Sequence, residues 1–208
     1  MKNVDYWERL IDNPPESYKR WFETEKEYLI KNIKKNSKVL DIGCGNGRII
    51  KIIAPMTNNI VGIDNERKAV NDSKNNLKNY PQIRILLSDS KKLPFEDDSF
   101  DFVVCMATLV NFGKYKIEAL NEMRRVIKKE GYIIIDVFSD DAFDERIKIY
   151  KKFKAPIKQI NGTTVIFEDT GISEQFTKEQ LIDIFNQAKL RIIEIKKWGI
   201  AYLCKLQK

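Results

Sequence analysis

The sequence predicts an α/β protein in which helices cover both faces of a doubly wound, mostly parallel sheet. Two observations lead to this fold class. Short apolar segments alternate with amphipathic segments through residues 38–138, a pattern typical of the strand–helix units that build a parallel sheet. The chain then ends in two β-like segments joined by a Trp-Gly turn, which adds a C-terminal antiparallel hairpin to the prediction.

The first elements are expected to be helical. Two adjacent prolines end a lead-in at residues 1–15, because proline cannot continue a helix. Residues 16–35 place Trp21, Leu29 and Ile33 on one face with charges elsewhere, as expected of an amphipathic helix.

Strands and helices then alternate. The strands are expected at 38–42, 60–63, 83–87, 100–106 and 132–138, and the helices at 47–54, 66–79 and 114–129. Gly131 stands where the glycine that ends a helix belongs. Right-handed crossovers place all strand-to-helix loops at one edge of such a sheet, so the loops after the strands are expected to meet there.

After residue 138 the pattern changes. The expected elements are a helix with a basic face at 140–154, short strands at 163–168 and 172–176 around the turn at 169–171, a helix at 178–189, and hairpin strands at 191–197 and 200–206. Thr177 is the expected N-cap of the last helix, with Gln180 as its partner in a capping box.

Composition limits the classes of function. The formal charge is +7, but lysine is spread along the whole chain and does not single out a nucleic-acid partner. The sequence has no histidine, the commonest general acid–base and metal ligand. The three cysteines are far apart without a C-x-x-C motif, so we expect reduced thiols in a cytoplasmic protein and no metal site. No apolar run approaches the ~20 residues that cross a bilayer, and we expect neither a secretory signal nor a membrane partner.

The most informative stretch is residues 39–48, with the sequence VLDIGCGNGR. A strand ends in an acid and a loop with alternating glycines, and an amphipathic segment follows, which is the layout of a nucleotide-type site. Glycine lets the backbone turn tightly and lets a ligand approach it closely. A dinucleotide fingerprint would need a third glycine at position 48, which is Arg48, so a nicotinamide-binding dehydrogenase is disfavoured.

This D-x-G-x-G-x-G stretch resembles the first motif of class I S-adenosylmethionine-dependent methyltransferases, because Asp41, Gly43, Gly45 and Gly47 match position by position. The resemblance implies a Rossmann-like sheet, S-adenosyl-L-methionine as cofactor and S-adenosyl-L-homocysteine as product. It also implies that the glycine loop passes under the methionine and ribose of the cofactor, and that Asp41 helps hold the amino group. The alternative is a glycine-rich turn in some other α/β protein.

Further positions match the family along the chain. Asp64 ends the second strand 17 residues after Gly47, and the resemblance assigns it both ribose hydroxyls, which its two acceptor oxygens can serve. Asn65 beside it is a candidate contact for the adenine. Asp89 is implied to accept from the exocyclic amine of the adenine, and the backbone N–H of Ser90 to donate to a ring nitrogen.

The segments L-P-F and D-x-S-F-D at 93–101 also match the family. The end of the fourth strand, Cys105 and Met106, is implied to line the cofactor. Arg125 is expected to form an ion pair on its own helix rather than to bind substrate.

Methyl transfer from a sulfonium is an in-line displacement. The protein mainly holds the acceptor atom about 3–3.5 Å from the methyl carbon and excludes water. A base is needed only for a protonated acceptor. Side chains expected near the mouth of the site are Tyr6, Tyr18, Asp136 and Asp140, but none stands out, so no catalytic residue is assigned.

Three readings of the acceptor stay open. A small molecule is preferred. Methylation of RNA or of a protein side chain is supported by the net charge and by the basic helix, which carries Lys148, Lys151, Lys152 and Lys154. A non-catalytic S-adenosylmethionine-binding protein is the third. Residues 105–108 read C-M-A-T rather than the [DNS]-P-P-[YF] of relatives that methylate nucleobases or amides, which disfavours that class.

We expect a single methyltransferase domain over residues 1–208. Its parts are an N-terminal helical lid at 1–36, a cofactor-binding core at 37–138, a substrate-side insertion at 139–176, and a C-terminal helix and β-hairpin at 177–208. The aromatic residues of the lid either cover the cofactor or form ordinary core, and they are Tyr6, Trp7, Tyr18, Trp21 and Phe22.

Overall fold

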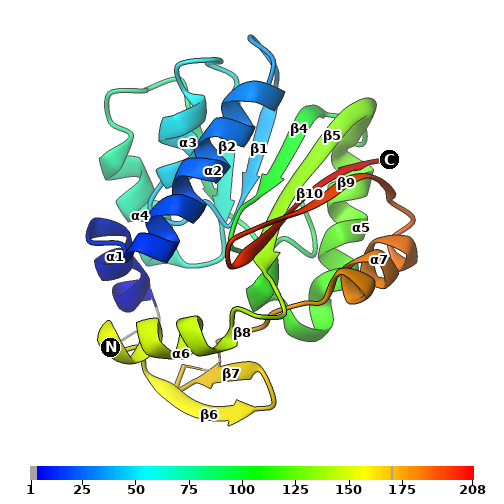
Figure 1. Ribbon diagram of the computed structural model, residues 1–208. Coiled ribbons are helices and arrows are strands. Elements are labelled where there is room, and N and C mark those ends of the chain that lie inside the picture. Colours follow the sequence, from blue (N-terminus) through cyan, green and yellow to red (C-terminus); the bar gives the residue numbers. More distant parts are fainter. Residues whose placement is uncertain (1–3, 170) are drawn as a thin grey trace.

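The computed structural model describes residues 4–169 and 171–208, and the first three residues of the predicted lead-in and Thr170 of the predicted turn lie outside the described residues. Within the described part, the main sheet has seven strands in the order β3-β2-β1-β4-β5-β10-β9 (Figure 1). The strands are β1 (Val39–Ile42), β2 (Ile60–Asp64), β3 (Arg84–Leu87), β4 (Phe100–Cys105), β5 (Ile127–Phe138), β9 (Arg191–Trp198) and β10 (Ala201–Gln207). The first five run parallel, and β10 pairs antiparallel with β5 and β9. The predicted fold class is confirmed.

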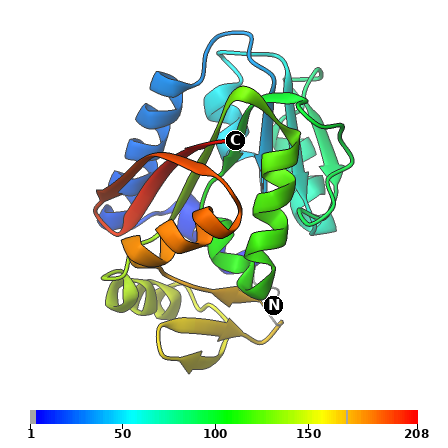
Figure 2. The same cartoon turned by 90° about the vertical axis from the view of Figure 1, so that its right-hand side faces the viewer.

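Helices cover both faces of this sheet (Figure 1, Figure 2). They are α1 (Val4–Asp12), α2 (Glu16–Asn32), α3 (Arg48–Ile53), α4 (Arg67–Asn76), α5 (Lys116–Val126), α6 (Phe143–Lys152) and α7 (Lys178–Gln187), with 3-10 turns η1 (Leu109–Asn111) and η2 (Gly113–Tyr115). Leu29 of α2 and apolar residues of α3 and α4 lie in one core, whereas Tyr18 and Trp21 of α2 lie in the other with apolar residues of α5 and α7. Val103 and Val104 of β4 lie in different cores, because successive strand side chains point to opposite faces.

Two predicted helix boundaries have different outcomes. The capping box at α7 is confirmed, because Thr177 and Gln180 each accept from the other's backbone N–H, over 3.2 Å and 2.9 Å. The prediction that Gly131 ends a helix is wrong, because α5 ends at Val126 and Gly131 lies inside β5. A Cβ at Gly131 would come 2.8 Å from the carbonyl oxygen of Asp101. The glycine therefore serves close backbone approach, not a helix end.

The insertion after β5 consists of α6 and a small antiparallel sheet of β6 (Ile157–Asn161), β7 (Thr164–Phe167) and β8 (Ile172–Ser173). Strand β6 was not predicted, because its side chains are mostly polar and exposed. A turn signal was present nevertheless. Asn161 pairs with Thr164 across a two-residue turn that begins with Gly162 at a φ of 57°, and glycine there is a known hairpin preference.

The carboxyl ends of the parallel strands lie at one edge of the sheet, as the crossover rule predicts. The glycine loop, Asp64, residues 88–90 and residues 105–108 follow these strand ends. In Figure 1, α1, α6 and the small sheet lie beneath this edge. No helix in the described part of the chain is long and apolar enough to span a membrane.

Candidate active site

The glycine loop between β1 and α3 forms one wall of the site. Gly43 and Gly45 have φ angles of 71° and 52°, which residues with a Cβ rarely adopt. The N–H groups of Gly43 and Cys44 both donate to the carbonyl of Ile63 over 2.9 Å, which ties the loop to β2. A Cβ on Gly43 would come 2.2 Å from Thr108 Cγ2, whereas a Cβ on Gly45 would meet open space. Gly45 is therefore where a ligand can approach the backbone.

A cavity of about 420 Å³ opens beside this loop, and its volume is in the range of small-molecule sites in proteins. The predicted cofactor residues that line it are Gly43, Gly45, Asp64, Asn65, Ser90 and Met106. The structure does not bring three other predicted residues into the cavity wall, namely Asp41, Asp89 and Cys105.

Asp64 ends β2 with its carboxylate bound to the glycine loop. The N–H of Gly45 donates to Oδ2 over 3.0 Å, and the N–H of Glu66 donates to Oδ1 over 2.9 Å. Burial raises the pKa of Asp64, although both backbone hydrogen bonds oppose this rise. Each carboxylate oxygen has two lone pairs, so both oxygens keep acceptor capacity. A ribose diol fits a carboxylate of this kind on the cavity wall.

Asp41 lies in β1 just before the glycine loop, with 1% of its surface exposed. Its Oδ2 atom has no hydrogen-bond partner in the described structure, although buried polar atoms nearly always have one. Burial raises the pKa of Asp41 to about 7, against the opposing charge of Arg48. A cationic group held at the glycine loop would balance this carboxylate. The residues present therefore fit S-adenosylmethionine, which carries an amino group.

A buried cluster of charges joins α2 to the same region. Arg48 donates to both carboxylate oxygens of Glu25, over 2.5 Å and 3.1 Å. Asp136 of β5 accepts from the indole N–H of Trp21 over 2.7 Å. Burial, followed by the nearby Glu25 carboxylate, raises the pKa of Asp136 well above its usual value. The charge of Arg48 is thus paired with Glu25, and its pKa is raised by Glu25 and also by the nearby acids Asp136 and Asp41.

The segment after β3 contributes Ser88 and Ser90 to the cavity wall. Asp89 between them is turned toward its own loop. Its Oδ1 accepts from the backbone N–H of Lys91 over 2.9 Å, and its Oδ2 lies 3.4 Å from Lys91 Nζ. The predicted contact of Asp89 with the adenine stays a prediction.

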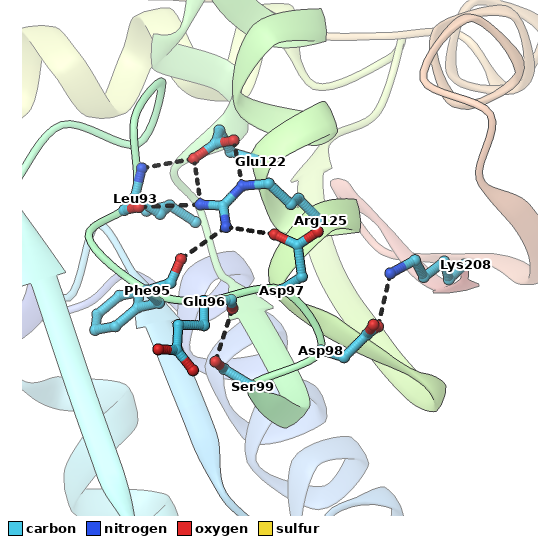
Figure 3. A network of polar contacts seen from close by, with 9 residues as sticks. All are labelled: Leu93, Phe95, Glu96, Asp97, Asp98, Ser99, Glu122, Arg125 and Lys208. Atoms are coloured by element: carbon cyan, nitrogen blue, oxygen red, sulfur yellow. Dashed lines mark hydrogen bonds and ion pairs between the residues drawn. The ribbon is translucent and has the colours of Figure 1, made fainter.

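Arg125 of α5 clamps the loop that follows (Figure 3). Its guanidinium donates to the carbonyls of Leu93 and Phe95, over 3.0 Å and 2.7 Å. It also forms ion pairs with Glu122 and Asp97, and Glu122 accepts from the N–H of Leu93 over 2.7 Å. The structure therefore places Arg125 in ion pairs that fix the L-P-F segment.

The end of β4 brings Met106 and Thr108 to the cavity wall. The thiol of Cys105 is buried in the core, where burial raises its pKa. Ala107 has a φ of 54°, and its N–H donates to Asp136 Oδ1. Such backbone strain costs free energy and must be held by its surroundings. Asp136 therefore helps fix the conformation that presents Met106 and Thr108.

Aromatic side chains line another part of the cavity. Tyr6 of α1 packs against Phe167 and Tyr150 of the insertion, with ring centroids 5.5 Å and 5.4 Å apart. Tyr6 and Tyr150 line the cavity, as do Trp7 and Phe138. The other aromatic residues of the predicted lid pack in the core, and they are Tyr18, Trp21 and Phe22.

Helix α1 contacts both the insertion and the cofactor-binding core. Arg9 donates to the carbonyl of Phe153 at the end of α6, over 2.7 Å. Glu8 forms an ion pair with Lys68 of α4, over 3.1 Å. With Tyr6 between the rings of the insertion, the helix bridges the insertion and the cofactor-binding core.

Of the four side chains considered as a base, Tyr6 alone lines the cavity. Tyr18 and Asp136 are fully buried, and Asp140 accepts from the hydroxyl of Tyr202 over 3.1 Å. Burial raises the pKa of Tyr6 well above its usual value, so this phenol is a donor rather than a base at neutral pH. No catalytic residue is assigned. Among the described residues, no three His, Cys, Asp or Glu side chains are arranged to hold a metal ion.

The Glu25–Arg48 pair was not predicted, although the sequence carries a signal for it. Tyr18, Trp21, Glu25 and Leu29 recur at the spacing of one helix face, and all four are buried in α2. A charge on a buried face needs a partner, and Arg48 takes the position where a dinucleotide motif has glycine.

Comparisons with known proteins give the family. A model described as a methyltransferase domain matches residues 33–189. A demethylmenaquinone methyltransferase of Staphylococcus saprophyticus is 28% identical over 207 residues, covering 89% of this chain and 84% of the relative. Its counterpart from Bacillus velezensis is 31% identical over 159 residues, covering 74% of this chain and 66% of the relative. A crystal structure of a Pyrococcus horikoshii protein has the same fold, with a TM-score of 0.74. That protein is 23% identical in sequence, and the match covers 94% of this chain and 93% of that one.

The family model covers most of the chain, from the end of α2 through α7. It includes every residue predicted to contact the cofactor. The chain therefore belongs to the class I S-adenosylmethionine-dependent methyltransferases, and it is an enzyme whose methyl donor is S-adenosylmethionine.

Proposed function

We propose that this methyltransferase transfers the methyl group to a small-molecule acceptor by in-line displacement, and that S-adenosyl-L-homocysteine is the product. The observation that carries the proposal is a single cavity with two kinds of wall. The glycine loop and Asp64 line one part, and Tyr6, Phe138 and Tyr150 line another. The names of the two demethylmenaquinone methyltransferases support the proposal, because those names specify a small molecule.

The cofactor supplies an electrophilic methyl carbon, and the protein supplies alignment and exclusion of water. Gly43 and Gly45 leave room for the methionine part, Asp64 accepts from the ribose hydroxyls, and Asp41 balances the amino group. In the same proposal the residues near the adenine and the sulfonium are Asn65, Asp89, Ser90, Cys105 and Met106.

The chain acts as one domain in this proposal. Residues 1–36 form the lid, 37–138 bind the cofactor, 139–176 face the acceptor and 177–208 complete the sheet. We also assign the protein to the cytoplasm, because Cys44, Cys105 and Cys204 are unpaired, buried thiols, as expected in a reducing compartment.

Calorimetric titration with S-adenosylmethionine and, separately, with NAD tests the cofactor assignment. Binding of S-adenosylmethionine without binding of NAD is expected.

Transfer of a labelled methyl group to a panel of small aromatic, amine and acid acceptors, compared with transfer to RNA and to protein, tests the class of the acceptor. Label transfer confined to RNA or protein, with binding that falls steeply as salt rises, would contradict the small-molecule proposal. Cofactor binding without transfer to any acceptor would favour a non-catalytic binding protein.

A further inference from the structure

Arg146 of α6 is a buried cation beside the aromatic part of the cavity. None of its surface is exposed. Its guanidinium carbon lies 4.8 Å from the ring centre of Phe138 and 5.8 Å from that of Tyr150. Both rings line the cavity, so the charge stands directly behind the cavity wall.

The hydrogen-bond partners of Arg146 are neutral. Nη1 donates to the side-chain oxygen of Gln175 over 2.8 Å and to the carbonyl of Thr163 over 3.2 Å. Nη2 donates to the carbonyl and the hydroxyl of Ser173, over 2.7 Å and 2.9 Å. Nε has no partner. No carboxylate in the described part of the chain lies within 4.0 Å of these nitrogens.

Arg48, the other arginine of the site, has charged partners where Arg146 has neutral ones. Arg48 is paired with the buried carboxylate of Glu25, and the nearby acids Asp136 and Asp41 also stabilise its charge. Taking a charge out of water without a countercharge costs several kcal/mol. The neutral partners of Arg146 explain how it ties α6 to β8, but none of them carries a negative charge.

Several hydroxyl groups lie near this charge. The hydroxyls of Tyr150 and Ser173 are hydrogen-bonded over 2.8 Å, and both residues line the cavity with Tyr6. The buried hydroxyl of Tyr18 has no partner in the described structure. Burial raises the pKa of Tyr6 and of Tyr18 well above the usual value, although the charge of Arg146 opposes the rise. These phenols are therefore protonated donors at neutral pH.

We propose that the methyl acceptor carries a carboxylate, which binds where Tyr6, Tyr150 and Ser173 line the cavity in front of Arg146. A carboxylate would supply the missing negative charge and would also accept from the hydroxyl donors. The aromatic wall suits an acceptor whose remaining part is planar and apolar. This assignment rests on the proposed small-molecule function, because it names the chemistry of that acceptor.

Benzoate and benzyl alcohol are matched probes, because they share the ring and differ in charge. Each is titrated into the full-length protein saturated with S-adenosylhomocysteine, and binding is followed by ligand-observed NMR. Benzoate is expected to bind about tenfold more tightly than the alcohol. Equal, reversed or undetectable binding of benzoate, in a protein that binds the cofactor, would overturn this inference and leave the proposed function intact. Failure to bind S-adenosylmethionine at all would defeat the proposed function, and this inference with it.

Variants separate recognition from a purely structural role. Arg146→Met should reduce the preference for benzoate to within about twofold, with the affinity for S-adenosylmethionine retained. Asp169→Asn is the matched control, because it removes a negative charge from the same cavity wall and should keep or strengthen the preference. If the methionine variant does not fold, Tyr150→Phe should weaken benzoate binding by about threefold without affecting the alcohol. A preference that persists in folded Arg146→Met would overturn the assignment.

Discussion

Replacement of Arg48 by methionine should destabilise the fold more than replacement of Glu25 by glutamine, although both changes break the same ion pair. Arg48→Met leaves the buried acids Glu25, Asp41 and Asp136 without the nearby positive charge that interacts with all three. Glu25→Gln leaves the guanidinium with an amide oxygen as acceptor and with two carboxylates nearby. The asymmetry follows because three acids share one guanidinium.

The magnitudes follow from burial. Glu25 is fully buried and the side chain of Arg48 is 17% exposed. Two unit charges ~4 Å apart attract by about 4 kcal/mol at an effective dielectric constant of ~20. The acids can take up protons, so we expect Arg48→Met to cost about 3 kcal/mol, at the lower end for a broken buried pair. Glu25→Gln loses a charge-assisted hydrogen bond, about 1–2 kcal/mol. Acidic pH should narrow this gap, because the pKa values of Asp41 and Asp136 are raised.

Urea unfolding followed by circular dichroism measures both free energies of unfolding. Lys128→Met is the control, because it breaks a more exposed pair with Asp101 and should cost less than about 1 kcal/mol. A loss for Arg48→Met that is no larger than the loss for Glu25→Gln would refute the reasoning.

Three further predictions concern the cofactor part of the site. Gly45→Ala should cost only about 1–2 kcal/mol of stability, yet it should weaken S-adenosylmethionine binding because its Cβ would enter the open space at the loop. Gly43→Ala would clash with Thr108, so this variant should show no folded state in thermal melts. Asp64→Ala should weaken S-adenosylmethionine binding about tenfold, or about 1.4 kcal/mol, by calorimetry, and unchanged affinity in a folded variant would remove the ribose assignment. Burial raises the pKa of Asp41 in the folded protein to about 7. The protonated carboxyl therefore contributes to the free energy of unfolding fully below the ordinary pKa of an aspartate. This contribution is lost as the pH rises to ~7, by up to about 1.4 kcal/mol per pH unit. Asp41→Asn should flatten this slope in urea unfolding, and affinity for S-adenosylmethionine should rise over the same range in the wild type alone.

The fold could be predicted from local patterns where each strand is a buried apolar run. β1 and β2 are such runs, and their ends coincide with the glycine loop and Asp64. The predicted elements differ from the structure in two places, where a glycine has another purpose and where a strand lacks a buried face. The position of Gly131 in the sequence predicts a helix end, but in the structure a glycine is needed there because the backbone of Asp101 lies too close for a Cβ atom. β6 has no buried face to give a period, and its turn at Gly162 was the available signal.

The candidate site divides in the same way. The glycine loop could be found because its backbone geometry demands glycine, whatever the rest of the chain does. Arg48 and Glu25 are 23 residues apart, and their pairing depends on how α2 lies on the sheet. Tyr6 and Ser173 lie far apart in the sequence, and both line the cavity only in the folded chain. No local sequence motif predicts contacts between residues this far apart in the chain.

The bridging position of α1 bears on how fast the enzyme works. The helix joins the insertion to the core through Tyr6, Arg9 and Glu8, and Tyr6 and Trp7 of the helix line the cavity, so we expect detachment of the helix to speed the exchange of a bound molecule. Short elements with few buried contacts open more often than a core does, and opening of such elements limits turnover in many enzymes. We therefore expect changes at Glu8 or Arg9 to alter how long the product stays bound, while the choice of acceptor stays the same.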